Sequence, residues 1–386
     1  MSYDVERLRA TEFPWAARGD AIYLNNASTG PLPGRAARAA AAFSALRTEP
    51  YRLTDEDEFA TLRRSRELCA QLIGSSPAEI ALMVNTSYGL NLAARALPLR
   101  PGDVILAPDR EFPANVYPWM ALGRAGVRFE RIPCTPDGLP DEAALLRAMD
   151  RPGVRAVTTS WVSFSTGFRV DLEALGRACR ERGLFLIVDA IQGLGAATLD
   201  VGQLSVDLLA CGGQKWLLSP WGTGFVYVRD ELVRQLEPSA VGWLATQGAD
   251  DFTRLVDYDF TYRDDARRFE VGTLPYQDFA AFNASLELLL ELGPAAVACH
   301  VEQIVSDAIA WAACRDDVRL VTPAHRARRA GIVCLAPRDA RAASERLERA
   351  RVVHALREGA IRLSPHCYNT REEMAQAVAV LVGEEQ

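Results

Sequence analysis

The chain has 386 residues, of which 49% are hydrophobic and 24% are charged, and its formal net charge at pH 7 is −7. These proportions are ordinary for a soluble globular protein, and the length suggests two or three domains. An acidic balance without a basic stripe argues against a nucleic-acid partner.

The eight cysteines are scattered, with no CxxC pair and no closely spaced histidines. This distribution indicates neither a zinc site nor a disulfide framework, and it suits a reducing cytosol. The first residues lack a basic start followed by an apolar run, and no window approaches the roughly 18 to 20 apolar residues of a membrane span. We therefore expect a cytoplasmic protein that binds neither a metal nor a membrane.

The amino-terminal part predicts an entry segment, a short strand and a helix. Residues 1–20 are polar and are interrupted by Pro14. Residues 23–33 combine a short apolar run with glycine and proline, which is typical of a strand followed by a turn. An Ala- and Arg-rich helix is expected over residues 34–47.

A possible phosphate site follows. Residues 80–84 predict a strand and residues 87–97 a helix, and the turn between them reads Asn-Thr-Ser-Tyr-Gly over residues 85–89. Such a turn offers backbone N–H groups and the positive end of a helix to a phosphate. Serine and threonine here could equally serve as simple helix N-caps. On the residues alone, the capping interpretation is the stronger of the two.

The middle of the chain alternates between strand and helix patterns. This alternation favours a largely parallel sheet covered by helices. The expected strands are 104–108, 128–133, 154–162 and the run that ends at Asp189, and the expected helices are 115–125, 141–149 and 171–182.

Polar side chains follow two of the apolar strands. Asp189 and Gln192 end the first strand region, and Lys215 follows the second. Carboxyl ends of such strands are where α/β sheets bind ligands. A carboxylate, an amide and an amine together suit pyridoxal 5'-phosphate (PLP), whose enzymes need a lysine and a carboxylate beside the ring nitrogen. Each residue alone could lie in a solvated turn, but the flanking glycines and Trp216 favour a shielded pocket.

The carboxyl-terminal part predicts a second, smaller unit. Residues 232–265 are irregular and aromatic-rich, which we interpret as active-site loops and a domain crossing. A long helical stretch over 275–315 then leads to a strand at 331–335, a helix at 339–349 and a strand at 360–363. Arg362 emerges from that last strand and is suited to hold a carboxylate with two hydrogen bonds.

These motifs together resemble the class V aminotransferase family of fold type I PLP enzymes, from about Tyr23 to about Thr370. The resemblance implies an α/β fold with a large domain, built on a mostly parallel seven-stranded sheet flanked by helices, and a small C-terminal α/β domain. The expected boundaries are an N-terminal segment (1–20) that packs with the small domain, a PLP-binding domain (21–265), and a linking helix with the small domain (266–386).

The resemblance also implies roles around the cofactor. Lys215 would form the Schiff base (the internal aldimine) and move the proton at Cα, Asp189 would keep the ring nitrogen protonated, and Gln192 would donate to the phenolic oxygen. Phe112 would stack on the ring where many relatives have histidine. The residues expected to hold the phosphate are Thr86, Ser87 and Gln214, together with Thr273 from a neighbouring subunit of a homodimer.

On the substrate side, the resemblance implies that Arg362 holds the α-carboxylate and that Asn26 and Ser28 lie beside the site. Ser163 and Phe164 stand near where relatives often carry asparagine or histidine. His366 is expected to be structural. The side-chain pocket cannot be derived from the sequence: Phe164, Trp216, Trp221 and Tyr368 suggest an apolar or aromatic cavity, and they are equally consistent with core positions.

A cysteine desulfurase reaction is disfavoured, because the sequence lacks a cysteine at the position that this reaction requires. Cysteine desulfurases of this superfamily carry a cysteine on a long loop ahead of the carboxylate-binding arginine, and no cysteine lies between Cys334 and Cys367. Cys334 is expected in the core. We therefore predict an aminotransferase-like enzyme acting at Cα of an amino acid, with a PLP-dependent C–S lyase or epimerase as the alternative. A PLP-fold sensor or scaffold without turnover is the alternative outside enzymes.

Overall fold

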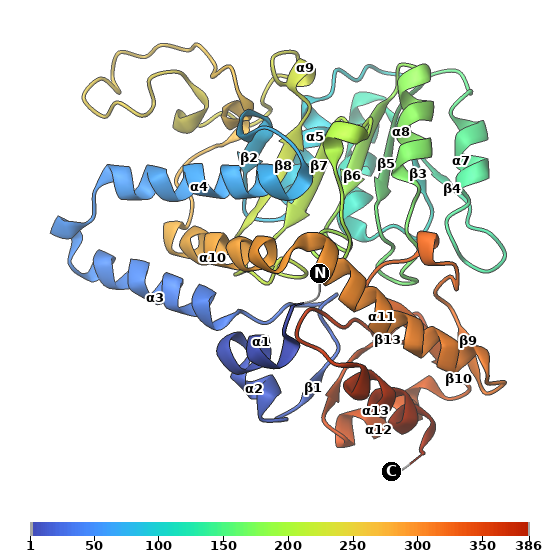
Figure 1. Ribbon diagram of the computed structural model, residues 1–386. Helices are drawn as coiled ribbons and strands as arrows, with labels where there is room; N and C mark the ends of the chain where they lie inside the picture. Colours follow the sequence, from blue (N-terminus) through green and yellow to red (C-terminus); the bar gives the residue numbers. More distant parts are fainter. Residues whose placement is uncertain (1–2, 385–386) are drawn as a thin grey trace.

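The computed structural model describes residues 3–384, and its large domain is a seven-stranded sheet between helices (Figure 1). The strand order is β2-β8-β7-β6-β5-β3-β4. Strands β3 to β7 pair in parallel, and β8 is antiparallel to both of its neighbours. This confirms the expected mostly parallel sheet. The strands are β2 Ile80–Leu82, β3 Val104–Pro108, β4 Arg128–Ile132, β5 Val154–Ser160, β6 Phe185–Asp189, β7 Leu208–Gly212 and β8 Gly224–Val228.

Both faces of this sheet are covered, which explains why its central strands are apolar throughout. Side chains alternate between the faces of a strand, so Leu186 and Val188 enter one buried cluster and Ile187 enters the other. The covering helices of the large domain include α5 Thr86–Ala96, α6 Tyr117–Ala121, α7 Glu142–Ala148, α8 Leu172–Glu181 and the short α9 Asp230–Val233. The expected helix over 115–125 is wrong in extent, because Pro118 lacks an N–H donor and short 3₁₀ turns flank α6.

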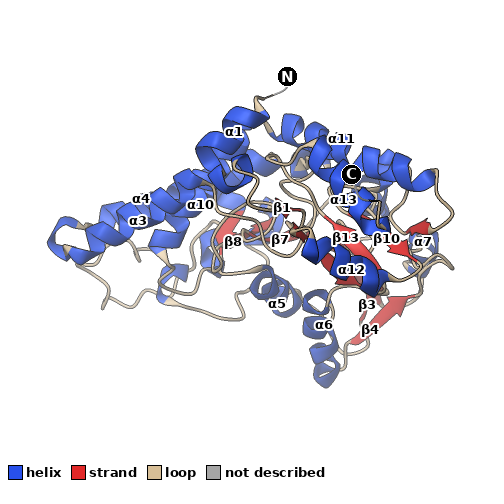
Figure 2. Ribbon diagram, turned by 90° about the horizontal axis from the view of Figure 1, so that it is seen from below, coloured by secondary structure: helices blue, strands red, loops and turns tan. Residues whose placement is uncertain are grey.

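Three long helices extend together from the body of the molecule. They are α3 Gly34–Thr48, α4 Asp55–Ile73 and α10 Tyr276–Leu292, and they lie side by side in both views (Figures 1 and 2). Helix α4 was not among the expected elements. Its start is nevertheless encoded locally, because Thr54 and Asp57 form a reciprocal capping box.

The expected single helix over 275–315 is two helices, which corrects that prediction. Helix α10 ends at Gly293, whose φ of 85° is favourable for glycine, and α11 Pro294–Ala313 begins at the proline that follows. The two helices meet at an angle of 78°. Among the described residues, no single helix is long and apolar enough to cross a membrane, and α10 with α11 reaches that length only as this bent pair.

The small domain is an antiparallel sheet with helices on it. Its order is β12-β13-β10-β9, with bounds β9 Val318–Leu320, β10 Val333–Pro337, β12 Ala355–Arg357 and β13 Ala360–Leu363. Helices α12 Ala340–Arg349 and α13 Arg371–Val382 pack there with α11. Strands β9 and β12 were not expected.

The amino-terminal segment contacts this small domain. It forms α1 Val5–Glu12 and α2 Pro14–Ala17, and β1 Ile22–Tyr23 then pairs with β11 Val352–Val353. The guanidinium of Arg9 donates to the carbonyl of Tyr368 at 2.8 Å and to Glu373 at 2.7 Å. The beginning of the chain is thereby tied to the end of it, close to the place where the two domains meet.

Candidate active site

The candidate site lies where the carboxyl ends of four neighbouring strands meet. Glu111 follows β3, Ser160 ends β5, Asp189 ends β6, and Lys215 follows β7. Ser160 and Asp189 are direct partners in the sheet register. Because these strands are parallel and adjacent, side chains more than 100 residues apart in sequence converge on one edge of the sheet.

Lys215 is the only lysine in the sequence, and all the other residues in its Lys and Arg total are arginines. A primary amine is therefore retained here alone, a signal that the motif-based reasoning overlooked. Burial lowers the pKa of the amine to about 8, although the nearby Asp189 carboxylate raises it. Its Nζ lies 5.7 Å from the centroid of the Phe112 ring.

The backbone around Lys215 is held by close contact with the amino-terminal turn. Gly30 N donates to the carbonyl of Gln214 at 2.9 Å, and Leu218 N donates to that of Lys215 at 3.1 Å. A Cβ on Gly30 would lie only 2.0 Å from the Lys215 carbonyl oxygen. Only glycine permits this approach, which fixes where the lysine side chain begins.

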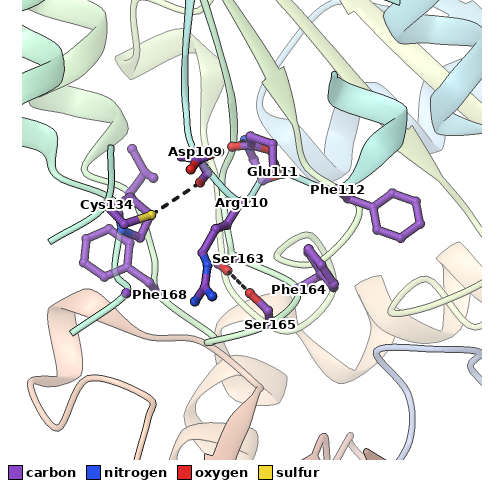
Figure 3. Close-up of a pocket in the computed structure, with 13 residues that line it drawn as sticks. Asp109, Arg110, Glu111, Phe112, Cys134, Ser163, Phe164, Ser165 and Phe168 are labelled. Atoms are coloured by element: carbon purple, nitrogen blue, oxygen red, sulfur yellow. Dashed lines mark hydrogen bonds between the residues drawn. The ribbon is translucent and has the colours of Figure 1, made fainter. Parts of the chain in front are cut away.

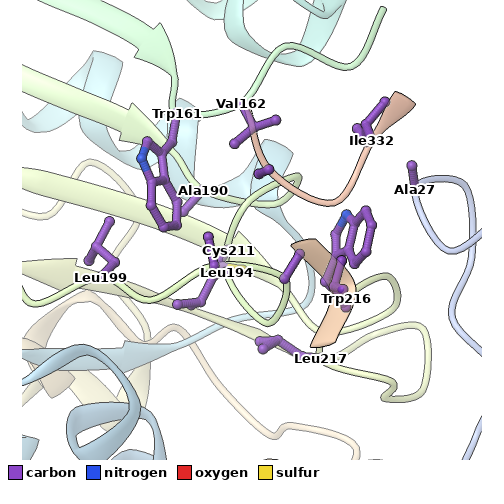
Figure 4. Packing of buried hydrophobic residues seen from close by; sticks show 14 of the residues in the cluster. Ala27, Trp161, Val162, Ala190, Leu194, Leu199, Cys211, Trp216, Leu217 and Ile332 are labelled. Carbon is purple, nitrogen blue, oxygen red and sulfur yellow. The ribbon is translucent and has the colours of Figure 1, made fainter. Parts of the chain in front are cut away.

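Trp216 anchors the same loop in the core (Figure 4). Its indole N–H donates to Gln192 Oε1 at 3.0 Å, and Gln192 Nε2 donates to the carbonyl of Ala27 at 3.0 Å. One amide hydrogen of Gln192 is left for a ligand. His366 Nε2 donates to the Trp216 carbonyl at 2.8 Å, and Nδ1 accepts from Cys367 N. Burial lowers the pKa of His366 to about 4, so the ring is neutral and structural.

Asp189 is almost completely buried. Its Oδ1 accepts from Ile191 N at 3.0 Å. Burial raises the pKa of the carboxyl to about 6, whereas this hydrogen bond and the Lys215 amine lower it. A carboxylate in such surroundings is stabilised by an additional cation or N–H donor, so Asp189 suits a protonated ring nitrogen.

Glu111 is a second carboxyl group at this edge, and the sequence analysis did not single it out. Its Oε1 accepts from Ser160 N at 2.7 Å, while Oε2 accepts from Ser160 Oγ and from Asn115 Nδ2 at 3.1 Å. Asn115 in turn accepts from Thr158 Oγ1 at 2.6 Å. Burial raises the pKa of Glu111 to about 7, and the charge of Asp189 also raises it.

The phosphate residues lie at the start of α5. Thr86 Oγ1 accepts from Gly212 N at 2.8 Å, so it joins the helix to the loop after β7. The N-cap of α5 is Asn85, whose side chain accepts from Tyr88 N. Thr86 and Ser87 are therefore not the caps, and Ser87 is exposed. Gln214 Oε1 is buried and has no hydrogen-bond partner among the described residues.

Arg362 lies in β13 of the small domain and is 2% exposed. Its Nη1 donates to the Phe164 carbonyl at 2.9 Å and its Nη2 to Ser28 Oγ at 2.7 Å, whereas Nε has no partner among the described residues. Burial lowers its pKa to about 10. Asn26 donates to the Ser364 carbonyl and accepts from Tyr368, so of these two candidates Ser28 is the one that bonds Arg362.

The expected aromatic wall is only partly present. Trp216 and Tyr368 are core residues, and Trp221 is 72% exposed. Phe164 does lie at the site and packs edge-on against Phe112, with ring centroids 5.3 Å apart. Phe112 is 45% exposed, so part of its side chain is accessible to a ligand.

The irregular segment expected over residues 232–265 starts within α9, and its expected role as active-site loops stays a prediction. In the described chain its residues pack against α4 and residues 266–271, with Phe252 against Phe59 and Trp243. Thr273 is exposed on the same side. The cysteines nearest Arg362 in sequence are buried, and burial raises the pKa of Cys334 to about 12. No metal-binding cluster occurs in the part of the chain that is described.

Comparisons with known proteins bear on this site. Residues 22–376 match the model of the family described as aminotransferase class-V. The chain is 32% identical over 324 residues to the uncharacterized aminotransferase YcbU of Bacillus subtilis, with 84% of this chain and 82% of that protein covered. It is 30% identical over 380 residues to the isopenicillin N epimerase of Streptomyces clavuligerus, with 94% and 95% covered. The solved structure of a C-DES mutant, with glycine covalently linked to its PLP cofactor, shares the fold at a TM-score of 0.88 and 24% identity, over 97% of this chain and 99% of that chain.

Proposed function

Because the chain belongs to the class V aminotransferase family, we propose that it is a PLP-dependent enzyme that acts at the Cα of an amino acid and transfers its amino group. The observation that carries the proposal is the single, buried Lys215 amine, whose pKa is lowered to about 8. A neutral amine is the form that attacks an aldehyde, so this group is prepared for covalent attachment near neutral pH.

The residues present fit PLP at both ends of the molecule. Asp189 supplies the charge opposite a ring nitrogen, and Phe112 supplies an open aromatic face. At the phosphate end, the buried amide oxygen of Gln214 has no partner within residues 3–384, and half a turn of that amide would present N–H donors. When bound, PLP supplies an aldehyde for amines and a ring that withdraws electrons from Cα.

The remaining steps are tasks for this chain's own groups. Arg362 offers an Nε–H that no described residue accepts, and a substrate carboxylate suits the guanidinium fork. Lys215, once released, is placed to hold and return the proton at Cα. Of the two residues placed at the ring face, Phe112 bears no titratable proton, so the proton at Cα is left to Lys215. One carrier supports proton transfer along one face, as transamination requires, better than the two-sided transfer of an epimerase.

We propose a cytoplasmic homodimer for this enzyme. All eight cysteines are free, which suits a reducing compartment. Thr273 is exposed, and Tyr258 and Phe260 on the irregular segment are 87% and 69% exposed. Burial against a second copy would cover these rings and could bring Thr273 to the neighbouring phosphate site.

The first test is spectroscopic and covalent. Purified protein with PLP should show a visible absorption band, and borohydride reduction should leave PLP attached to the peptide that contains Lys215. Lys215→Arg retains the charge, lacks a primary amine and leaves no lysine in the chain. It should lose both the band and the side-chain adduct. A wild-type protein without band or adduct would refute the proposal.

A second test addresses the reaction. Amino acids are added to the PLP-loaded protein, and transamination should convert the cofactor to its pyridoxamine form with release of a 2-oxo acid. Inverted amino acid without oxo acid would instead identify an epimerase, and release of pyruvate with sulfide a C–S lyase. Binding of amino acids without any turnover would favour a sensor or scaffold.

A further inference from the structure

A narrow cavity adjoins the site at the carboxyl ends of β3 and β5, and Arg110 occupies its centre (Figure 3). Phe112 and Phe164 line both this cavity and the Lys215 site. Figure 3 shows the Arg110 side chain directed toward Ser163 and Ser165, whose hydroxyl groups lie 3.3 Å apart. Beside the Arg110 side chain the cavity has room for little more than one water molecule, so a carboxylate would have to enter from the open side and shift that side chain.

The charges around the cavity leave one cation without a partner. Glu111 accepts three hydrogen bonds shorter than 3.2 Å from Ser160 and Asn115, and Asp109 pairs with Arg131 at 3.0 Å. Arg110 is exposed, and it makes no hydrogen bond or ion pair with any described residue. The cavity therefore offers free donors from a guanidinium and from hydroxyl groups, whereas its carboxylates are already engaged. Such a surplus of donors selects an anionic guest.

The backbone of Arg110 is strained, and its conformation is fixed by the residues on either side. Its φ is 62°, in the left-handed region that a long side chain rarely adopts. Both neighbours are held in place: Asp109 N donates to the Ile132 carbonyl at 2.8 Å, and Glu111 is bonded as described. Strained residues that their surroundings fix in this way cluster at functional sites.

We propose that Arg110, with Ser163 and Ser165, binds the side-chain carboxylate of a dicarboxylic amino acid whose α-carboxylate lies on Arg362. This inference rests on the proposed function and adds the substrate class to it. Arg362 Nη1 bonds the carbonyl of Phe164, and Phe164 lines the Arg110 cavity. A substrate held by both arginines would thus extend from the reacting centre past Phe112 and Phe164.

The test compares acidic amino acids with neutral ones of the same shape. Apparent dissociation constants for glutamate, glutamine, aspartate and asparagine are read from the absorbance of PLP-loaded protein. Arg110→Asn is the informative variant, because asparagine tolerates a positive φ and the Tm should stay equal or rise. It should weaken binding of the acidic substrate roughly 10- to 100-fold and that of its amide by less than about threefold. The control, Arg131→Asn, removes a neighbouring cation and should change neither.

A second arm does not depend on the cofactor. Succinate, glutarate and adipate are titrated calorimetrically into the full chain, each against the monocarboxylate of equal length. At least one diacid should bind more tightly than its partner and lose that advantage in Arg110→Asn. Equal weakening of acid and amide, or no diacid preference, would overturn the subsite. Loss of the PLP band with retained Arg110-dependent diacid binding would instead refute the proposed function and leave the subsite standing.

Discussion

Replacing Glu111 by glutamine tests whether ionisation of this buried carboxyl group destabilises the folded protein. Burial raises its pKa from the ordinary 4.5 to about 7. A carboxyl group whose pKa is higher in the folded state destabilises the fold as pH rises through the interval between the two values. Wild-type protein should therefore lose stability between about pH 4.5 and pH 7, and Glu111→Gln should not incur that loss.

The size of the effect follows from the two pKa values. At about 1.4 kcal/mol per pKa unit, ionisation of Glu111 costs about 1.4 kcal/mol at pH 5.5 and about 3.3 kcal/mol at pH 8.0. The glutamine variant should thus gain about 2 kcal/mol relative to wild type between these pH values. It also exchanges a donor-saturated carboxylate for an amide, which costs about 1 kcal/mol at both. Asp189 is present in both proteins, so its titration cancels to first order.

The assay is urea unfolding followed by tryptophan fluorescence at pH 5.5 and 8.0, without added cofactor. The matched control is Glu173→Gln, whose side chain is 75% exposed and hydrated in the folded and unfolded chain alike. It should change the free energy of unfolding by the same amount at both pH values. A Glu111→Gln difference that stays constant within about 0.5 kcal/mol would show that the buried carboxyl is not destabilised by its surroundings.

Three further outcomes are expected. Gly30→Ala places a methyl group against the Lys215 carbonyl, so it should lower the free energy of unfolding by about 1–3 kcal/mol and slow PLP attachment. Gly123→Ala adds its methyl group in open space and should do neither, and equal effects of the two variants would contradict the close contact. Arg66→Met leaves the buried Glu270 without the partner of its 2.6 Å ion pair and should lower the free energy of unfolding in urea by about 3–5 kcal/mol. Arg254→Met, at an exposed ion pair, should lower it by less than about 1 kcal/mol, and similar losses for the two variants would contradict the importance of burial. Because burial lowers the pKa of Lys215 to about 8, the stopped-flow rate of PLP attachment should rise with pH and level off above about pH 8; a continued rise toward pH 10 would show an unshifted amine.

Much of the fold and part of the site could be predicted because their signals are local. The apolar strands of the large domain are short runs, and polar residues directly after them mark the ligand edge of a parallel sheet. Asp189 and Lys215 were found in this way. Two local signals were present but unused, namely the capping box that starts α4 and the Gly293-Pro294 break. The uniqueness of Lys215 was a third.

Other features were decided only by contacts between distant segments. A carboxylate such as Glu111 could be solvated in any turn, and only its bonds to Ser160, 49 residues away, make it a buried group. The choice of Ser28 over Asn26 beside Arg362 depends on how two ends of the chain, 334 residues apart, pack together. The positive φ of Arg110 is likewise imposed by neighbours that β4 and β5 hold in place. The sequence by itself determined where most strands of the large domain lie along the chain and the chemistry at their ends, because these depend on neighbouring residues. The order of the strands in each sheet, burial, charge pairing and side-chain direction came from tertiary packing, because they are set by distant groups.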